Sequence, residues 1–219
     1  MKKNQMNYFI IGDVHGCYYT LLEMLKNWDS KKEYLIFVGD LIDRGNFSSQ
    51  VVKYCQNLTK NENCIILKGN HELEFIEYYE KGENDNWLNQ GGQKTLENFE
   101  DNSIDLDSTA VWFKNMPLKF EKDCFVVTHA GISKTENPFD ENNIDGVLWN
   151  RKVLKNIDKI QIHGHTPLLK NEPYYNTISN AWNIDTGAYY GFGRTGLKID
   201  SKGKLLKKIN VKTDSRDIW

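Results

Sequence analysis

Five short segments of this 219-residue chain, each containing glycine, hold all five of its histidines. The segments are GDVHG (12–16), GDLIDRG (39–45), GNHE (69–72), THAG (128–131) and HGHT (163–166). Aspartate, asparagine and histidine side chains are suitable ligands for manganese, iron or zinc. Asp13 and His15 are separated by one residue, so in an extended segment both side chains point the same way and can chelate one ion. The residue types therefore indicate a metal site.

The number of candidate ligands is large enough for two ions. Asp40 could bridge them, and the second ion would take the remaining candidates, Asn70, His129 and His165. Two dications held by the carboxylates of Asp13 and Asp40 would keep a net charge of about +2, which attracts phosphate and activates water near neutral pH.

Each segment has an ordinary explanation when it is taken alone. A single Asp or His at the end of a strand is most often a turn residue or a hydrogen-bonded polar group. Five such segments in one chain, with no histidine elsewhere, favour a common site.

Short apolar runs rich in β-branched and aromatic residues precede these segments. They predict buried strands over 8–11, 34–38, 64–67, 124–127 and 160–162. Apolar residues at helical spacing predict helices over 18–28, 48–58 and 72–80, and Ser48 is a plausible N-cap of the second. The alternation of strand and helix indicates an α/β fold, in which functional groups gather at the carboxyl ends of strands.

The remaining chain is less regular. Residues 82–120 are polar and are expected to be helical in pieces, with Asp107 or Ser108 capping a short helix that ends before Pro117. The tail predicts two strands joined by a turn at 200–203. We find no repeat or linker, so residues 1–219 are expected to form a single domain.

Composition and charge narrow the function. The net charge of −2 argues against a nucleic-acid-binding protein with a broad basic surface. No apolar run is long enough for a signal peptide or a membrane span. The four cysteines are scattered among apolar residues and are expected to be buried thiols, which fits a reducing, cytoplasmic location.

The five segments, in this order, resemble the motifs of the phosphoprotein phosphatase family of metallophosphoesterases. A further segment, WLNQGGQKTLENF (87–99), resembles the compact phage and bacterial branch of that family, with Gln90 where the branch often has Asn. The resemblance implies the metallo-dependent phosphatase fold, an α/β (α+β) architecture with a central β-sandwich flanked by helices. It also implies two divalent ions, with Mn expected and Fe, Zn or Ni as alternatives.

The resemblance also implies a role for each motif residue. Asp13 and His15 would bind the first metal, Asp40 would bridge both, and Asn70, His129 and His165 would bind the second. Arg44 would hold phosphate oxygens, and Arg151 in LWNRKVL (148–154) would do the same. His71 would protonate the leaving alkoxide, with Asp43 orienting its ring. For His163 two roles remain open. It could support the metal ligands or pack at the strand end, or it could contact the substrate.

The expected function is metal-dependent hydrolysis of phosphate monoesters, with phosphoserine and phosphothreonine residues of proteins as substrates and phosphotyrosine as a further one if the enzyme has dual specificity. Symmetrical hydrolysis of dinucleoside tetraphosphates is the alternative. A phosphodiesterase or nuclease and a binding domain without catalysis are less favoured, because Arg44 suits a terminal phosphate and every metal-ligand position is filled. We expect a monomer that acts on a phosphoprotein or a small phosphomonoester, with no nucleic-acid or membrane partner.

Overall fold

Two five-stranded sheets form the centre of the molecule in the computed structural model, which describes residues 6–218. The strand order is β10-β9-β1-β2-β3 in the first sheet and β4-β5-β6-β8-β7 in the second. The first sheet comprises β1 (Asn7–Ile11), β2 (Glu33–Phe37), β3 (Cys64–Ile66), β9 (Arg194–Ile199) and β10 (Leu205–Val211). The second comprises β4 (Lys119–Glu121), β5 (Phe125–Thr128), β6 (Ile160–His163), β7 (Tyr174–Asn176) and β8 (Ala181–Asn183).

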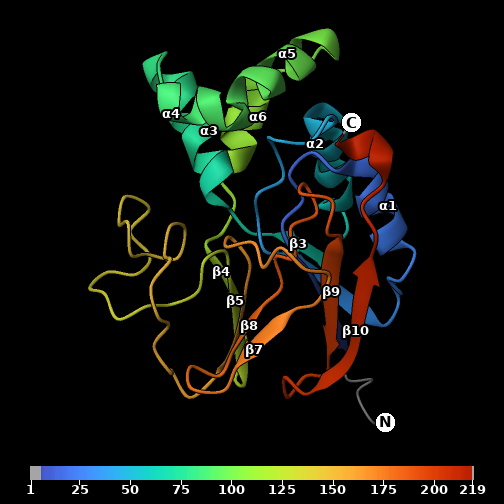
Figure 1. The fold of residues 1–219 in the computed structure, drawn as a ribbon, viewed down its shortest axis with the longest axis vertical. Coiled ribbons are helices and arrows are strands. Elements are labelled where there is room, and N and C mark those ends of the chain that lie inside the picture. Colours follow the sequence, from blue (N-terminus) through green and yellow to red (C-terminus); the bar gives the residue numbers. More distant parts are fainter. Residues whose placement is uncertain (1–5, 219) are drawn as a thin grey trace.

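The helices occupy two places relative to the sheets (Figure 1). Helices α1 (Tyr18–Leu25) and α2 (Ser48–Leu58) lie beside the first sheet. Helices α3 (Asn70–Lys81), α4 (Asp85–Trp87), α5 (Gln93–Asp101) and α6 (Leu106–Lys114) gather above the sheets, and a π-helical turn over Leu88–Gly92 joins α4 to α5.

Alternating side chains of the first sheet enter two different apolar cores. Phe9 and Ile11 of β1 pack with the helices, whereas Ile10 packs with Phe125 and Ile162 of the second sheet. Because successive side chains of a strand point to opposite faces, one apolar strand can join both layers. The result is the central β-sandwich flanked by helices that the sequence resemblance implied.

The parallel strands of each sheet end at one edge. β1 runs parallel to β2, and β2 to β3; β5 runs parallel to β6, and β6 to β8. The segments that follow β1, β2 and β3 therefore leave the first sheet side by side, and those that follow β5 and β6 leave the second in the same way. These five exits are the glycine-containing segments of the sequence.

The strand and helix predictions hold in outline and fail at several boundaries. The five early strands, the tail hairpin, the helical middle segment and the three early helices are present, although α1 ends at Leu25 rather than at 28. Strands β4, β7 and β8 were not predicted. Each has only three residues and includes a polar one, unlike the equally short but wholly apolar β3.

Three local predictions are wrong. Ser48 is the first residue of α2 rather than its N-cap, and its Oγ accepts a hydrogen bond from the Asp43 backbone N–H (3.0 Å). Asp105, not Asp107 or Ser108, caps α6, because its side chain accepts a hydrogen bond from the Ser108 N–H. Cys124 is exposed, whereas Cys17, Cys55 and Cys64 are buried as expected. Within residues 6–218, no helix combines the length and apolar character needed to cross a bilayer.

Candidate metal centre

Two groups of potential metal ligands share Asp40. One group combines Asp40 with His15 and His71, and the other combines it with His129 and His165; within each group the ligand atoms lie within 4.8 Å of one another. All five side chains are buried. The structure thus brings together residues from five strand exits, and Asp40 is common to both groups.

In the second group, several lone pairs point at one place. The His129 ring uses Nδ1–H to donate to the Val38 carbonyl (3.0 Å), which leaves Nε2 unprotonated when the ring is neutral. That Nε2 lies 3.0 Å from Asn70 Oδ1, 3.1 Å from His165 Nδ1 and 3.4 Å from Asp40 Oδ2. Such a set of acceptor atoms repels itself unless a proton or a cation lies among them. The donor set therefore fits a divalent ion.

Asp13 sits against this group without completing a hydrogen-bond set. Its Oδ2 accepts from the His165 backbone N–H (3.0 Å), and its Oδ1 is buried with no hydrogen-bond partner among residues 6–218. A Cβ on Gly164 would lie 1.8 Å from that Oδ1, so only glycine permits this approach. A buried carboxylate oxygen without a donor is costly in the metal-free protein, and a cation would satisfy it.

His71 and Asp43 form the tightest contact of the centre. His71 Nδ1 donates to Asp43 Oδ2 at 2.5 Å, and both side chains are almost fully buried. Asp43 is held in turn by Trp87 Nε1 (2.7 Å, to Oδ2) and by the Thr95 hydroxyl (2.6 Å, to Oδ1). The carboxylate can therefore neither rotate nor leave the imidazole.

The segment around the π-helical turn positions this network. Gly91 has φ of 120°, and a Cβ there would lie 2.6 Å from the Arg44 backbone nitrogen, so the turn can lie directly against the Asp43–Arg44 segment. π-helical turns are frequent at functional sites. Trp87 and Thr95 belong to the segment that carried the branch resemblance, but the sequence gave no reason to place them on Asp43.

The two arginines differ in their exposure and contacts. Arg44 points between the two histidines of the first group, with Nη1 3.1 Å from His15 Nε2 and Nη2 3.2 Å from His71 Nε2. Arg151 is exposed. Burial and the neighbouring His129 lower the pKa of His165 well below its usual value, and the Arg151 charge adds to this effect.

The charges within the centre are unevenly balanced. Burial works to raise the pKa of Asp40, but the neighbouring His129, His71 and His15 outweigh it and hold that pKa well below its usual value. Burial works to lower the pKa of His71, but Asp40 and Asp43 raise it to about 9. Burial, then Asp185 and Asp40, raise the pKa of Asp13 well above its usual value. In the metal-free centre, protons held by His71 and by Asp13 thus offset carboxylate charge that a bound cation would balance instead.

Two further buried residues position the strand exits and were not predicted. The Glu72 carboxylate accepts hydrogen bonds from the backbone N–H groups of Asp40 (2.9 Å), Leu41 (2.7 Å) and Gly69 (2.8 Å). Glu72 therefore ties two strand exits together. Arg194 donates to the carbonyls of Asp13 (3.2 Å) and Val14 (2.6 Å), which fixes the first exit.

The β-sandwich with a shared cluster of Asp, Asn and His side chains at its strand exits defines a metallophosphoesterase. The sequence profile of the calcineurin-like phosphoesterases matches residues 6–213, and the chain belongs to that family. Within residues 6–218, the structure also contains two groups of buried side chains that could hold a metal ion, and the two groups share Asp40.

Curated relatives of nearly the same length fall into two activities. Serine/threonine-protein phosphatase 1 of Salmonella typhimurium is 27% identical over 211 residues, which cover 90% of this chain and 94% of that protein. The asymmetrical bis(5'-nucleosyl)-tetraphosphatase PrpE of Halalkalibacterium halodurans is 28% identical, covering 89% of this chain and 90% of that protein. A solved serine/threonine phosphatase from Saccharomyces cerevisiae superposes with a TM-score of 0.65 at 16% identity, over 97% of this chain and 81% of that one, and shows the fold alone.

Proposed function

We propose that this protein hydrolyses phosphate monoesters, with phosphoserine and phosphothreonine residues of proteins as its substrates. The observation that supports this most directly is the buried pair of His71 and Asp43, which lies beside Arg44 at the edge of the paired ligand groups. Such an arrangement offers one group to hold a terminal phosphate and another to protonate the leaving oxygen.

Two divalent ions would be held by residues of five strand exits, and we assign the ligands as the sequence suggested. Asp13 and His15 belong to one ion, Asp40 to both, and the other ion takes Asn70, His129 and His165. When bound, the ions would neutralise phosphate charge and lower the pKa of a water molecule. The acceptor atoms that meet at His129 Nε2 support the second ligand set. Manganese is the expected metal, and iron, zinc or nickel would suit the same nitrogen and oxygen donors.

The side chains of this protein then carry out the remaining steps. The planar guanidinium of Arg44 matches two phosphate oxygens, and Arg151 would bind the same phosphate. The Nδ1 proton of His71 is hydrogen-bonded to Asp43. Nε2 is therefore the atom that gives a proton to the departing alkoxide. Asp43 holds the ring in this tautomer and stabilises its charged form.

Hydrolysis of dinucleoside tetraphosphates is the second candidate. The PrpE relative bears that name, and the match extends over 90% of its length, so the overall size of this chain does not favour either activity. The sequence resemblance pointed to symmetrical cleavage; a symmetrical tetraphosphatase of Edwardsiella ictaluri is 34% identical, but over only 58% of this chain and 44% of that protein.

A hydrolysis panel tests the proposal. Phosphoserine and phosphothreonine peptides, diadenosine tetraphosphate and a phosphate diester would each be incubated with protein loaded with Mn, Fe, Zn, Ni or Mg. We expect the phosphopeptides to be cleaved with the highest kcat/KM and the diester with the lowest. A higher kcat/KM for diadenosine tetraphosphate would favour the second candidate function over the first. Absence of hydrolysis of every ester would refute the proposed function.

A further inference from the structure

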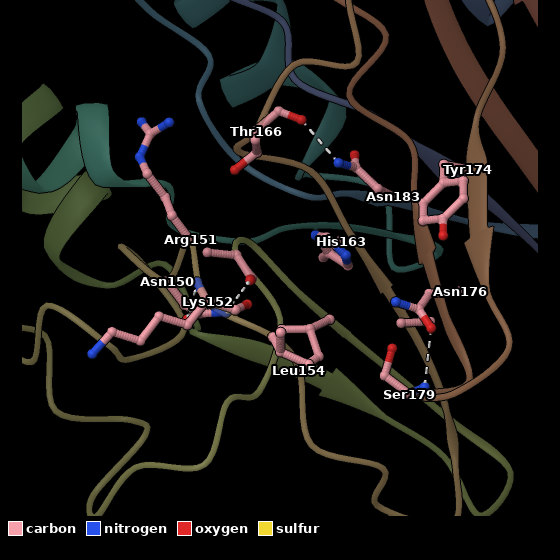
Figure 2. A pocket seen from close by; sticks show the side chains of 13 residues that line it. Asn150, Arg151, Lys152, Leu154, His163, Thr166, Tyr174, Asn176, Ser179 and Asn183 are labelled. Atoms are coloured by element: carbon pink, nitrogen blue, oxygen red, sulfur yellow. Dashed lines mark hydrogen bonds between the residues drawn. The ribbon is translucent and has the colours of Figure 1, made fainter.

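A recess of about 190 Å³ opens beside the candidate metal centre, between the end of β6, strand β7 and the loop that follows Asn150. Figure 2 shows Arg151 on one side of it, Tyr174 on the other and His163 between them. Its volume is smaller than the roughly 300–1,000 Å³ of pockets that enclose a drug-sized ligand, so it can hold one ring rather than a whole substrate.

Polar atoms inside the recess lack partners. The Ser179 side chain is almost fully buried, and its Oγ has no hydrogen-bond partner within the described part of the chain. In Figure 2 this hydroxyl points into the recess. His163 Nδ1–H donates to the Gly164 carbonyl (3.1 Å), which leaves Nε2 as an acceptor. A buried hydroxyl without a partner costs stability, so a ligand that bonds to it gains binding energy.

A third polar group adds donors at the wall. Asn176 Oδ1 accepts from the backbone N–H groups of Ile178 (2.9 Å) and Ser179 (3.3 Å), which fixes the amide with its NH2 group available. The recess therefore offers both donors and acceptors from uncharged side chains.

The rest of the wall is apolar, and the charges stand at the mouth. Leu154, Ala130 and Ala181 provide flat apolar surface. Lys152 is paired with Asp145 (2.7 Å), and Arg151, for which a phosphate-binding role is proposed, also lines the recess.

We propose that this recess binds the nucleobase of a nucleoside phosphate whose phosphate group lies at the metal centre. A flat heterocycle carries both N–H donors and ring-nitrogen acceptors on its edge, which suits Ser179 Oγ, His163 Nε2 and the Asn176 amide. The apolar faces of the heterocycle suit packing against Leu154 on one wall of the recess. The ring of Tyr174 is half exposed at the rim and is available for stacking.

Other groups suit the recess less well. A carboxylate would meet no cation inside it, an aliphatic chain would leave the Ser179 hydroxyl without a partner, and a phenyl ring presents only C–H groups at its edge. Nucleobase binding depends on the phosphate site of the proposed function, and it extends that function to nucleotides as a class of ligand.

Binding of a phosphonate analogue of AMP, in which a methylene group replaces the ester oxygen, tests the proposal without turnover. Calorimetric affinities of the Mn-loaded protein would be compared for this analogue and for the corresponding ribose phosphonate, which lacks the base. We expect the AMP analogue to bind at least tenfold more tightly. In Tyr174→Leu, the ratio of the two affinities should fall about tenfold, which is the effect of one lost stacking contact. In Ser179→Ala, the same ratio should fall roughly threefold or more, because one hydrogen bond is lost.

Tyr175→Leu is the matched control. Tyr175 is the next residue of the same strand, but its ring packs on Trp182 and its hydroxyl donates to Asn180 (2.6 Å). The control should keep the preference for the base. Thermal unfolding would confirm that the variants fold, which is expected for Tyr174 because its side chain is half exposed.

The outcomes separate this inference from the proposed function. Equal affinities of the two probes for the wild type, or equal losses in Tyr174→Leu and Tyr175→Leu, would overturn it. A Tyr174→Leu variant that loses phosphopeptide hydrolysis without changing the probe preference would also overturn it, because the recess would then hold a peptide side chain. A clear preference for the AMP analogue in a protein that cleaves no ester would support the recess and refute the proposed hydrolase function.

Discussion

Trp87 Nε1 donates to Asp43 Oδ2 at 2.7 Å, and this is the same oxygen that accepts the hydrogen bond from His71. A residue from the π-helical segment therefore fixes the carboxylate that orients the proposed acid. Because Trp87 is fully buried, this contact is shielded from water. A hydrogen bond to a charged group is stronger in the protein interior than at the surface.

Replacement of His71 by Asn should separate the proton-transfer step from phosphate binding. We expect kcat on an alkyl phosphate to fall by about 10²–10⁴, because the departing alkoxide would no longer receive a proton. An activated aryl phosphate should lose much less, since its leaving group needs no protonation. Steady-state kinetics on the two esters, together with metal analysis showing full occupancy, checks this. Equal losses on both esters would argue against His71 as the acid.

Asp40→Asn should lower metal content as well as rate. Asp40 belongs to both ligand groups, so loss of its charge weakens both sites. Elemental analysis after dialysis should show fewer than two ions per chain in this variant and no change in Asp123→Asn, which alters an exposed carboxylate. Full occupancy in Asp40→Asn would contradict the bridging role.

Thr95→Val should loosen Asp43 without touching a proposed metal ligand. Loss of the 2.6 Å hydrogen bond leaves one carboxylate oxygen short of a donor, which costs about 1–3 kcal/mol of stability. We expect kcat to fall further below the wild-type value on alkyl phosphates than on aryl phosphates. We also expect the Trp87 indole N–H signal in the NMR spectrum to shift. Thr109→Val, a buried substitution on α6, is the control and should leave that signal in place. An unchanged indole signal in Thr95→Val would show that the network is not formed in solution.

Only one thiol of the folded protein should react with an alkylating reagent. The thiolate is the reactive form; burial raises the pKa of Cys17 and of Cys64 to about 12 and that of Cys55 well above its usual value. Cys124 is exposed. Mass spectrometry should therefore find one adduct on the native protein, none on native Cys124→Ser, and four on the denatured wild type. Rapid labelling of a second cysteine would contradict the packing of the helical layer.

Glu121 should give a small, pH-dependent contribution to stability. Hydrogen bonds from Lys119 and Lys159 lower the pKa of its carboxyl to about 2. A folded-state pKa below the unfolded value of about 4.3 means that the contribution is present above that pH and is lost as the pH falls towards 2. The difference in melting temperature between wild type and Glu121→Gln should therefore be largest near neutral pH and shrink below about pH 4.5.

The size of this difference is limited, because the Glu121 side chain is more than one-third exposed and added salt screens it. Glu136→Gln, at an exposed carboxylate of the loop after β5, is the control and should show no such pH dependence. A difference that stays constant from pH 7 to pH 3 would rule out the two-lysine contact as its cause.

Much of the centre was predictable because its residues follow recognisable strands. Apolar runs of four or five residues indicated β1, β2 and β5, and the polar residues directly after each run included Asp13, Asp40 and His129. Parallel strands end at one edge of a sheet, so adjacency could be inferred without coordinates. The branch segment at 87–99 was also visible, but a motif alone does not say which carboxylate its Trp and Thr will bind.

By itself, the sequence indicated the candidate metal ligands, the strands that carry them and, through its motifs, the family to which the chain belongs. Only the tertiary structure decided which atoms meet: that Asp40 belongs to two ligand groups, that Glu72 ties two strand exits together, and that Ser179 faces a recess beside Arg151. Local patterns record the period and the end of each element, because these depend on neighbouring residues. Contacts between residues separated by tens of positions depend on how the two sheets pack, and no local pattern records that.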